Sequence, residues 1–367
     1  MENTSLENRL DYEPRTETIE EPAHGVHIGL LGNYSDSDET RILLTPEACG
    51  LITSAGIPVS MESGAGVDIS FTDDDYARYG VKIVSREQAL RCNVVLSFLP
   101  LRANDIRKMN KGAALLCMMG STIFETETIK ALLDMHISAG CLDNMMSHHD
   151  VPIFADIIDE IDGRSAIMYA EDALSYLGGG KGVLLGGVTG LNPCEVIVIG
   201  TGTSAVAAAN AAINTGARVV LMDNDISALH QNKRLCHPSV ELVAIHPRVL
   251  ANHVKAADVI ITGPTSNPFE FPKNLSGSLK ETVYILDLTE THPSVSVPRT
   301  VAMALSNPLV NFINEMAIKN DFKGMISTTP GVQCGMVTYE GRLVDKLVGS
   351  YTSLPSVDIR VMLSASN

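Results

Sequence analysis

A glycine-rich turn between two apolar strands constrains the fold of this 367-residue chain more than any other feature. The segment EVIVIGTGTSAVAAANAAINTGARVVLMD, from Glu195 to Asp223, has the pattern of a strand, a tight turn, a helix and a second strand. The turn carries Gly200-x-Gly202-x-x-Ala205, and an acid closes the second strand. This order and spacing are typical of a βαβ unit that binds a dinucleotide at the start of its helix.

Each small residue of this pattern is explained by the steric needs of the bend or of a bound pyrophosphate. Gly200 allows the tight turn, Gly202 lets a pyrophosphate approach the backbone, and Ala205 keeps the helix close to the strand. The start of the helix offers free N–H groups and partial positive charge to phosphates. A βαβ unit with the same turn and no ligand is the alternative. The turn residues predicted to bind the cofactor are Gly200, Thr201, Gly202, Thr203 and Ser204.

An acid at the end of the second strand selects the cofactor. Asp223 is predicted to accept hydrogen bonds from the adenosine ribose hydroxyls, and its charge would repel a 2′-phosphate, so NAD is favoured over NADP. Arg218 precedes the strand and is too far away to compensate that charge. Thr262 and Gly263 follow a later apolar strand and are expected to line the same crevice.

Strand and helix patterns alternate along most of the chain, which predicts an α/β fold with parallel sheets wrapped by helices. In TPEACGLITSAG, Thr45 is the expected N-cap, Pro46 the first helical residue and Gly56 the stop. One long helical pattern starts near Asp156 and ends in a glycine cluster that reads as a loop. At roughly 150 residues per domain, the length predicts two domains. Near the end, ALSNPLVNFINEMAIK and GRLVDKLVGSY are both predicted to be helical.

The composition excludes several classes of protein. With 27 Lys and Arg against 43 Asp and Glu, the net charge is −16, which argues against nucleic acid or an anionic membrane as a partner. No apolar stretch is long enough to span a membrane. Residues 1–26 are expected to form an acidic arm, either a solvated tail or a docking segment. The seven scattered cysteines fit reduced thiols in a cytoplasmic protein.

Several motifs in the same order along the chain give it a recognisable family. The chain resembles the alanine dehydrogenase/pyridine nucleotide transhydrogenase family over about residues 27–350. ETRILLTPEA is similar to that family's E-x-R-V-A-L-T-P motif. The other matching segments are ESGAGVDISFTDDDYARYGVKIV, IDGRSA, GGGKGVLLGGVTGLNPCEVIVIGTGTSA, SVPRTVAMALSNPLVNFI and GMVTYEGRLVDKLV.

The resemblance implies two doubly wound, Rossmann-like domains, with the NAD domain inserted into a discontinuous substrate domain. Residues 27–152 and 304–367 would form the substrate domain, and residues 153–303 the NAD domain. A small substrate with a carboxylate would bind in the cleft between them. Family members are homo-oligomers, dimers or hexamers, so the same assembly is expected here.

The chain keeps one of the family's substrate-binding residues and lacks others. An arginine in the first motif binds the substrate carboxylate in alanine dehydrogenases, and Arg41 stands at that place; a surface salt bridge is the alternative role. The family's V-K-E-P lysine is replaced within Ser97-Phe98-Leu99. Its acid/base histidine is missing from Gly120-Ser121-Thr122. Asp287 matches one family aspartate, Thr291 replaces a second, and the long loop that should follow is absent.

Other residues could supply the missing acid/base. His148 and His149 precede the crossover between the domains, while Glu290 and His292 lie beyond a strand end near the cofactor crevice. Solvated loop positions are the alternative for each of these residues. The His148-His149-Asp150 group does not predict a metal site, because consecutive side chains rarely converge on one ion.

Two functions of different classes follow from these observations. The first is an NAD-dependent oxidoreductase of the alanine dehydrogenase type, acting on a small amino or keto acid, with Arg41 on the carboxylate. The second is a catalytically depleted NAD-binding homologue with a sensing or assembly role. Imino-acid reduction needs a group that moves a proton, and the sequence has none where the family keeps it. The catalytic acid/base is therefore not assigned.

Overall fold

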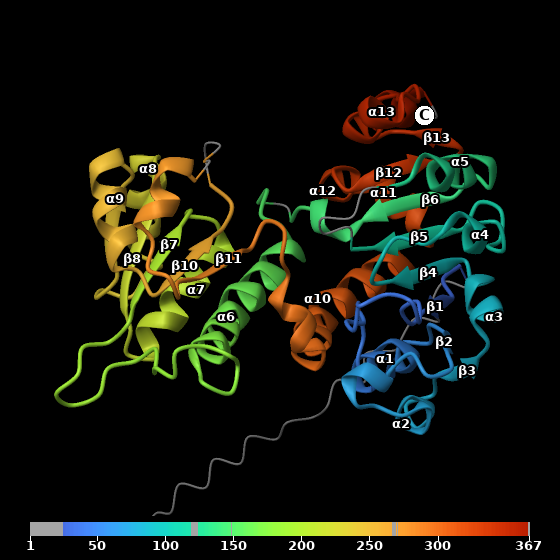
Figure 1. Ribbon diagram of the computed structural model, residues 1–367. Helices are drawn as coiled ribbons and strands as arrows, with labels where there is room; N and C mark the ends of the chain where they lie inside the picture. Colours follow the sequence, from blue (N-terminus) through green and yellow to red (C-terminus); the bar gives the residue numbers. More distant parts are fainter. Residues whose placement is uncertain (1–24, 119–123, 148, 266–268, 270, 366–367) are drawn as a thin grey trace, which may run out of the picture.

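The protein consists of two α/β sheets, one mostly parallel and one wholly parallel, that lie on either side of two long helices (Figure 1). The computed structural model describes residues 25–118, 124–147, 149–265, 269 and 271–365. This arrangement confirms the predicted α/β class with two Rossmann-like units. Among the described residues, no helix combines the length and apolarity needed to cross a bilayer.

The larger sheet has eight strands, in the order β13-β12-β6-β5-β4-β1-β2-β3. Its parallel strands all come from the first part of the chain, and two strands from the C-terminal part add to one edge in antiparallel orientation. The sheet therefore combines the two ends of the chain. Its strands are β1 (Ile28–Leu30), β2 (Val59–Glu62), β3 (Lys82–Val84), β4 (Val94–Ser97), β5 (Ala114–Cys117), β6 (Ser138–Cys141), β12 (Met336–Tyr339) and β13 (Arg342–Leu343).

Short capped helices cover both faces of this sheet. Thr45 caps the first of them as expected, since its side chain accepts a hydrogen bond from the Ala48 N–H, and Gly56 follows it with φ of 78°. The helices and turns are α1 (Pro46–Ser54), η1 (Val67–Ile69), α2 (Asp73–Ala77), α3 (Arg86–Leu90), α4 (Ala103–Ile106), α5 (Thr126–Asp134), η2 (Leu142–Asn144), α11 (Phe322–Thr328), α12 (Pro330–Gln333), α13 (Lys346–Thr352) and α14 (Ile359–Ala365).

The smaller sheet has five parallel strands, in the order β11-β10-β7-β8-β9. The order reverses between β7 and β10, which is where open α/β sheets bind their ligands. Separate apolar clusters fill its two faces, one below α6 and α7 and the other below α9. Its elements are β7 (Glu195–Ile199), α7 (Thr203–Asn214), β8 (Arg218–Asp223), α8 (Ile226–Asn232), β9 (Glu241–Ala244), α9 (Pro247–Ala256), β10 (Val259–Thr262), η3 (Lys273–Ser278), β11 (Tyr284–Asp287) and η4 (Pro293–Ser296).

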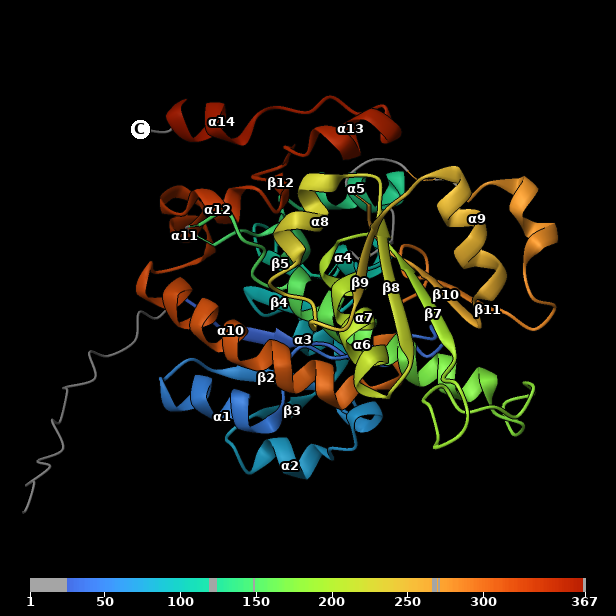
Figure 2. The same cartoon turned by 90° about the vertical axis from the view of Figure 1, so that its left-hand side faces the viewer.

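Two long helices, α6 (Ala155–Leu174) and α10 (Pro298–Ile318), connect the two sheets (Figures 1 and 2). Helix α6 packs against α7 of the smaller unit, while α10 packs against α1 of the larger one. The strands of each sheet fall within the ranges assigned to the two domains, whose exact boundaries stay a prediction. The boundary drawn between residues 303 and 304 cuts through α10, because Pro298 already starts this helix.

The structure differs from the sequence pattern near the C-terminus. The segment GRLVDKLVGSY was predicted to be one helix, but Arg342–Leu343 form β13 and only Lys346–Thr352 are helical. Gly341 has φ of 77°, which sets the tight turn between β12 and β13. The edge of the neighbouring sheet offers backbone hydrogen bonds that the local helical pattern does not reveal.

Close packing of α6 on α7 makes Gly163 a sensitive position. A methyl group at Gly163 would lie 2.1 Å from the carbonyl oxygen of Ser204, a backbone atom that cannot rotate away. Alanine is the better helix former by about 0.5–1 kcal/mol, but overpacking costs about 1–3 kcal/mol. We therefore expect Gly163→Ala to lower the free energy of unfolding, measured by urea denaturation.

Gly277→Ala is the matched control for this experiment. A methyl group at Gly277 would have no atom within 4 Å. This variant should unfold at the same urea concentration as the unaltered protein. Unchanged stability of Gly163→Ala would contradict the close packing of the two helices.

Candidate functional site

The glycine-rich turn lies at the carboxyl end of β7, where the order of the smaller sheet reverses. Gly200 has φ of 116°, and a Cβ there would lie 2.7 Å from the Pro264 carbonyl oxygen. Only glycine accepts both constraints without strain. Gly202 is the N-cap of α7, and no side chain caps this helix end. The backbone at the start of α7 is thus arranged as an anion-binding terminus.

The hydroxyl group of Ser204 supports this assignment. Ser204 is 2% exposed, and its Oγ has no hydrogen-bond partner within the part of the chain that the structure describes. It lies next to Gly263, since a Cβ built on that glycine would be 3.5 Å from the oxygen. A buried polar group without a partner is costly unless a ligand or water satisfies it. The turn residues therefore fit a phosphate-containing cofactor.

The loop after β10 closes over the turn. The Gly202 N–H donates a hydrogen bond to the Pro264 carbonyl oxygen, with 3.3 Å between nitrogen and oxygen. A pyrophosphate that binds this N–H has to replace that contact. Gly263, predicted to line the crevice, is buried directly beside Ala205. A ligand that uses the Gly202 N–H thus requires the Gly263–Pro264 segment to move away from the turn.

Asp223 has a structural role in addition to the predicted ribose contact. Its side chain is fully buried and accepts hydrogen bonds from the Thr201 hydroxyl, at 2.7 Å, and from the Asp225 N–H, at 2.9 Å. Each carboxylate oxygen can accept a second hydrogen bond. The contact with a ribose stays a prediction, and it requires the residues that cover Asp223 to move. Arg218 pairs with Glu241 at the other end of β8.

Two of the cavities among the described residues, of about 340 and 360 Å³, lie near segments that the sequence analysis singled out or next to strand ends. One cavity, of about 360 Å³, lies at the carboxyl ends of β7, β10 and β11. Thr262 and Gly263 line it, together with Asp287 and Thr289. In dinucleotide-binding sheets, the ligand crosses the carboxyl ends of the strands, and one half of it lies on each side of the pyrophosphate turn. Strands β10 and β11 lie on the side of the turn opposite to Asp223. The predicted positions of Thr262 and Gly263 therefore fit a nicotinamide crevice.

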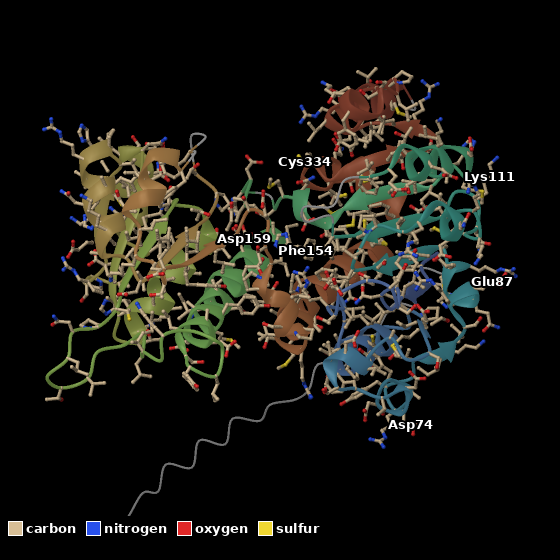
Figure 3. All side chains as sticks on the ribbon, viewed as in Figure 1. Asp74, Glu87, Lys111, Phe154, Asp159 and Cys334 are labelled. Atoms are coloured by element: carbon tan, nitrogen blue, oxygen red, sulfur yellow. The ribbon has the colours of Figure 1, made fainter. Side chains whose placement is uncertain are left out.

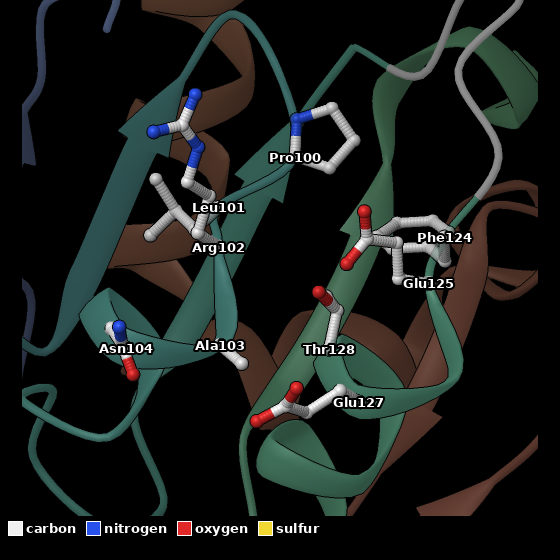
Figure 4. A pocket seen from close by; sticks show the side chains of 9 residues that line it. All are labelled: Pro100, Leu101, Arg102, Ala103, Asn104, Phe124, Glu125, Glu127 and Thr128. Atoms are coloured by element: carbon white, nitrogen blue, oxygen red, sulfur yellow. The ribbon is translucent and has the colours of Figure 1, made fainter.

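The other cavity, of about 340 Å³, lies in the larger unit between the starts of α4 and α5 (Figure 4). Two of its three charged side chains already have partners. Arg102 forms an ion pair with Asp36, and Glu127 forms one with Arg107. A new ligand there would have to compete with both pairs, so this cavity is the weaker candidate.

Arg41 is buried at the junction of the two units, not at a solvated surface. Its Nε and Nη2 atoms each donate to a carboxylate oxygen of Glu39 at 2.7 Å. Its Nη1 donates to the Ser294 hydroxyl at 2.8 Å. Ser294 belongs to η4, which follows β11 of the smaller sheet. The arginine thus connects the ETRILLTPEA segment of the larger unit with the segment that follows the last strand of the smaller sheet.

The residues that replace the family's lysine and histidine are only partly described. Phe98 lies under the Arg41 guanidinium, with 4.4 Å between Cζ and the ring centre, and so supports the arginine. Ser97 is buried at the end of β4, and Leu99 is half-buried. Gly120, Ser121 and Thr122 lie outside the described residues.

Three aspartates on α6 form a row that the sequence analysis missed. Asp156, Asp159 and Asp162 are three residues apart and therefore share one side of the helix. Asp156 accepts a hydrogen bond from the Thr203 hydroxyl at 3.0 Å, and so touches the first residue of α7. Figure 3 shows Asp159 in the region between the two units. The three-residue spacing within the predicted helix was the available signal.

The last of these aspartates holds η4. Asp162 is 2% exposed, and its two oxygens accept hydrogen bonds from the Ser294 N–H, at 2.7 Å, and from His292 Nδ1, at 3.1 Å. The bond to Asp162 raises the pKa of His292 above its usual value. The other ring nitrogen, Nε2, is buried with no partner among the described residues. His292 is thereby fixed in orientation by a carboxylate.

The other residues considered for proton transfer are less well placed. His149 and Glu290 are exposed, and His148 lies outside the described residues. Within the described ranges, no group of three or more His, Cys, Asp or Glu side chains has the arrangement of a metal site. The junction between the units therefore holds Arg41, His292 and the α6 aspartates as its chemically useful groups.

Comparisons with known proteins identify two family segments. The family model described as "Alanine dehydrogenase/PNT, N-terminal domain" matches residues 34–156. The model described as "Alanine dehydrogenase/PNT, C-terminal domain" matches residues 166–267, which include the glycine-rich turn. Together the two segments cover most of the chain in the family's own order.

Curated relatives match over nearly their whole length. An alanine dehydrogenase from Mycobacterium tuberculosis is 26% identical over a 361-residue alignment that covers 87% of this chain and 95% of the relative. One from Bacillus subtilis is 25% identical over 350 residues, covering 85% and 91%. Among solved structures, an L-alanine dehydrogenase has a TM-score of 0.80 at 22% identity, covering 90% of this chain and 100% of that one.

A second solved structure extends the match to the transhydrogenases. The transhydrogenase from Sinorhizobium meliloti has a TM-score of 0.72 at 17% identity, covering 88% of this chain and 99% of that one. At this level of identity, the two structural matches establish the fold and carry no statement about the residues of the site.

The two roles of Asp223 can be separated by substitution. Asp223→Ala removes the partner of Thr201 and any partner of the ribose, and a lost hydrogen bond to a charged group costs about 1–3 kcal/mol. We expect NADH affinity to fall about 5- to 150-fold, measured by fluorescence titration. Thr201→Val is the control, because it removes only the hydrogen bond within the turn.

The control should lower NADH affinity less than Asp223→Ala does. An equal loss in both variants would mean that Asp223 acts only by holding the turn. The unaltered protein should also bind NADH more tightly than NADPH, and the opposite preference would contradict the predicted ribose contact.

Proposed function

Because the chain belongs to the alanine dehydrogenase/pyridine nucleotide transhydrogenase family, we propose that it is an NAD-dependent oxidoreductase acting on a small amino or 2-oxo acid. One observation carries the proposal. Arg41 is buried against Ser294, so a group that can bind a carboxylate lies next to the segment that follows the last strand of the cofactor sheet. Substrate and nicotinamide would therefore meet at the junction of the two units.

The residues of the turn would hold the cofactor. The N-terminal backbone of α7 and the Ser204 hydroxyl would bind the pyrophosphate, and Asp223 would bind the adenosine ribose. Thr262 and Gly263 would line the crevice for the nicotinamide. Bound NAD supplies a hydride acceptor, and NADH a hydride donor, for the α-carbon of the substrate.

Arg41 keeps enough donors for a substrate. A guanidinium has five N–H groups. Glu39 uses one on Nε and one on Nη2, and Ser294 uses one on Nη1. One N–H therefore remains on each terminal nitrogen, and a carboxylate can bind this pair with two parallel hydrogen bonds. Glu39 would hold the guanidinium in place from the side, while the substrate carboxylate binds the two terminal nitrogens.

The second candidate function is NAD binding without turnover, in a sensing or assembly role. Two observations favour it. Glu39 already neutralises the charge of Arg41. The family's lysine and histidine positions hold residues that cannot transfer a proton or bind a carboxylate by charge. This candidate predicts NADH binding and no reaction with any 2-oxo acid.

Assembly as a homo-oligomer is also part of the proposal. The glycine-rich loop after α6 carries apolar side chains that are largely solvent-exposed in one chain: Tyr176, Leu177, Leu184 and Leu191, at 83%, 96%, 72% and 72%. Contiguous exposed apolar side chains often mark protein–protein contacts. Sedimentation or light scattering of the purified protein tests this part of the proposal.

One experiment separates the two candidate functions. NADH is titrated first and followed by fluorescence, and then a set of small 2-oxo acids is offered together with ammonia and NADH. Oxidation of NADH that depends on both the acid and ammonia supports the dehydrogenase. Binding without oxidation supports the second candidate, and absence of binding contradicts both.

Arg41→Lys tests the carboxylate contact. A lysine cannot reproduce two parallel hydrogen bonds, and hydrogen bonds to charged groups contribute about 1–3 kcal/mol. We expect the KM for the carboxylate substrate to rise about 5- to 150-fold, while the Kd of NADH stays nearly unchanged.

Arg102→Lys is the matched control, since Arg102 also pairs with an acid and stacks on a ring, but at the surface. It should leave the KM as it is. An unchanged KM in Arg41→Lys would exclude Arg41 from the substrate site.

A further inference from the structure

The acidic row on α6 runs from the cofactor turn to the substrate arginine. Asp156 contacts Thr203 at the start of α7, and Asp162 holds Ser294, which in turn accepts a hydrogen bond from Arg41. Asp159 lies midway between them, about 4.5 Å along the helix axis from each neighbour. Its carboxyl group is therefore placed between the phosphate-binding helix end and the carboxylate-binding side chain.

Asp159 differs from its two neighbours in having no hydrogen-bond partner. Among the described residues, none donates a hydrogen bond to its oxygens, whereas Asp156 and Asp162 are both engaged. It is half-buried, so a bound molecule can reach it. His292, by contrast, is held by Asp162, and its second nitrogen is enclosed. Asp159 is thus the titratable group at the junction that remains available to a ligand.

We propose that Asp159 is the general acid/base of this protein, taking the role for which the family's histidine position has no suitable residue. The inference rests on the proposed oxidoreductase function. Two observations support it. Asp159 lies between the turn and Arg41, and the buried Ser204 hydroxyl has no partner among the described residues, which indicates a ligand site at the turn.

The surroundings of Asp159 give it a suitable affinity for a proton. Burial, with the nearby Asp162 and Asp156 carboxylates, raises the pKa of Asp159 to about 6. His292 on η4 acts in the opposite direction, and Asp143 on η2 adds a smaller increase. A group with such a pKa can both accept and return a proton near neutral pH.

The proton transfers balance for oxidation of an amino acid. The Asp159 carboxylate takes one proton from the substrate ammonium, which leaves a neutral amine. The Cα–H electron pair leaves as a hydride to the oxidised nicotinamide, while the nitrogen lone pair forms the C=N bond. Water then adds to this carbon and gives one proton to solvent. Asp159 finally returns its proton to the nitrogen, and the C–N bond breaks to release ammonia while the C=O bond forms. The ammonia takes up the proton of the former hydroxyl group and becomes ammonium.

Equilibrium binding tests the position of Asp159 without any turnover. The nicotinamide ring is cationic in NAD⁺ and neutral in NADH, so an ionised carboxylate beside it favours NAD⁺ by charge. The ratio of the two dissociation constants is measured between pH 5 and 8. In the unaltered protein, we expect NAD⁺ to gain on the order of tenfold over NADH as the pH rises through 6.

Three variants complete the experiment. Asp159→Asn should remove this pH dependence, because an amide does not ionise in this range. Asp159→Glu should retain it, because it keeps a carboxyl group. Glu160→Gln is the matched control, since Glu160 is the exposed neighbour that pairs with Arg164 on another side of α6, and it should behave as the unaltered protein. Thermal unfolding of each variant checks that it is folded.

Turnover gives the second measurement. Asp159→Asn should lower kcat about 10²- to 10⁴-fold, and the limb near pH 6 should disappear from the pH profile. If both cofactors bind and Asp159→Asn leaves the pH dependence of their ratio unchanged, the role of Asp159 is wrong and the oxidoreductase proposal stands. If neither cofactor binds to the unaltered protein, both proposals are wrong.

Discussion

The buried carboxylate of Asp162 is the contact on which the junction of this protein depends. A buried charge is tolerated only when it is hydrogen-bonded, and Asp162 meets this condition through the Ser294 N–H and the His292 ring. These two bonds fix η4 on α6. Because the Ser294 hydroxyl accepts a hydrogen bond from Arg41, the position of Arg41 also depends on Asp162. One carboxylate therefore links the connecting helix α6, the segment that follows the smaller sheet and the larger unit.

The same region balances opposite charges within a small volume. Arg41 is paired with Glu39 and rests on Phe98, so its charge is compensated before any substrate binds. The row of aspartates on α6 adds negative charge close to a helix end that favours anions. Burial and the charges of Asp162 and Asp156 raise the pKa of Asp159, the member of the row whose side chain has no hydrogen bond among the described residues. The burial and like-charge repulsion that destabilise the ionised aspartates thus also give Asp159 its proposed role in proton transfer.

The local elements of the fold could be predicted from the sequence because their causes are local. The Thr45 cap, the stop at Gly56 and the turn at Gly200 each depend on residues within one turn of chain, and the structure has all three. The segment after Gly341 was predicted wrongly as a single helix, because β13 forms by pairing with a strand that its own pattern does not include. The replacements at the family's lysine and histidine stay a prediction from aligned motifs, and nothing in those motifs pointed to residues on α6.

By itself, the sequence determined the fold class, the dinucleotide turn and the choice of Arg41 as the arginine of interest. The reason is that helix caps, glycine turns and hydrophobic periodicity act over a few residues. Only the tertiary structure decided the surroundings of these residues. It brought Arg41 to Ser294 across 253 positions and His292 to Asp162 across 130. It also buried the Asp223 side chain in hydrogen bonds of its own and left the Asp159 side chain without one among the described residues. Such contacts depend on how two sheets and two long helices pack, and burial and charge at the site follow from that packing.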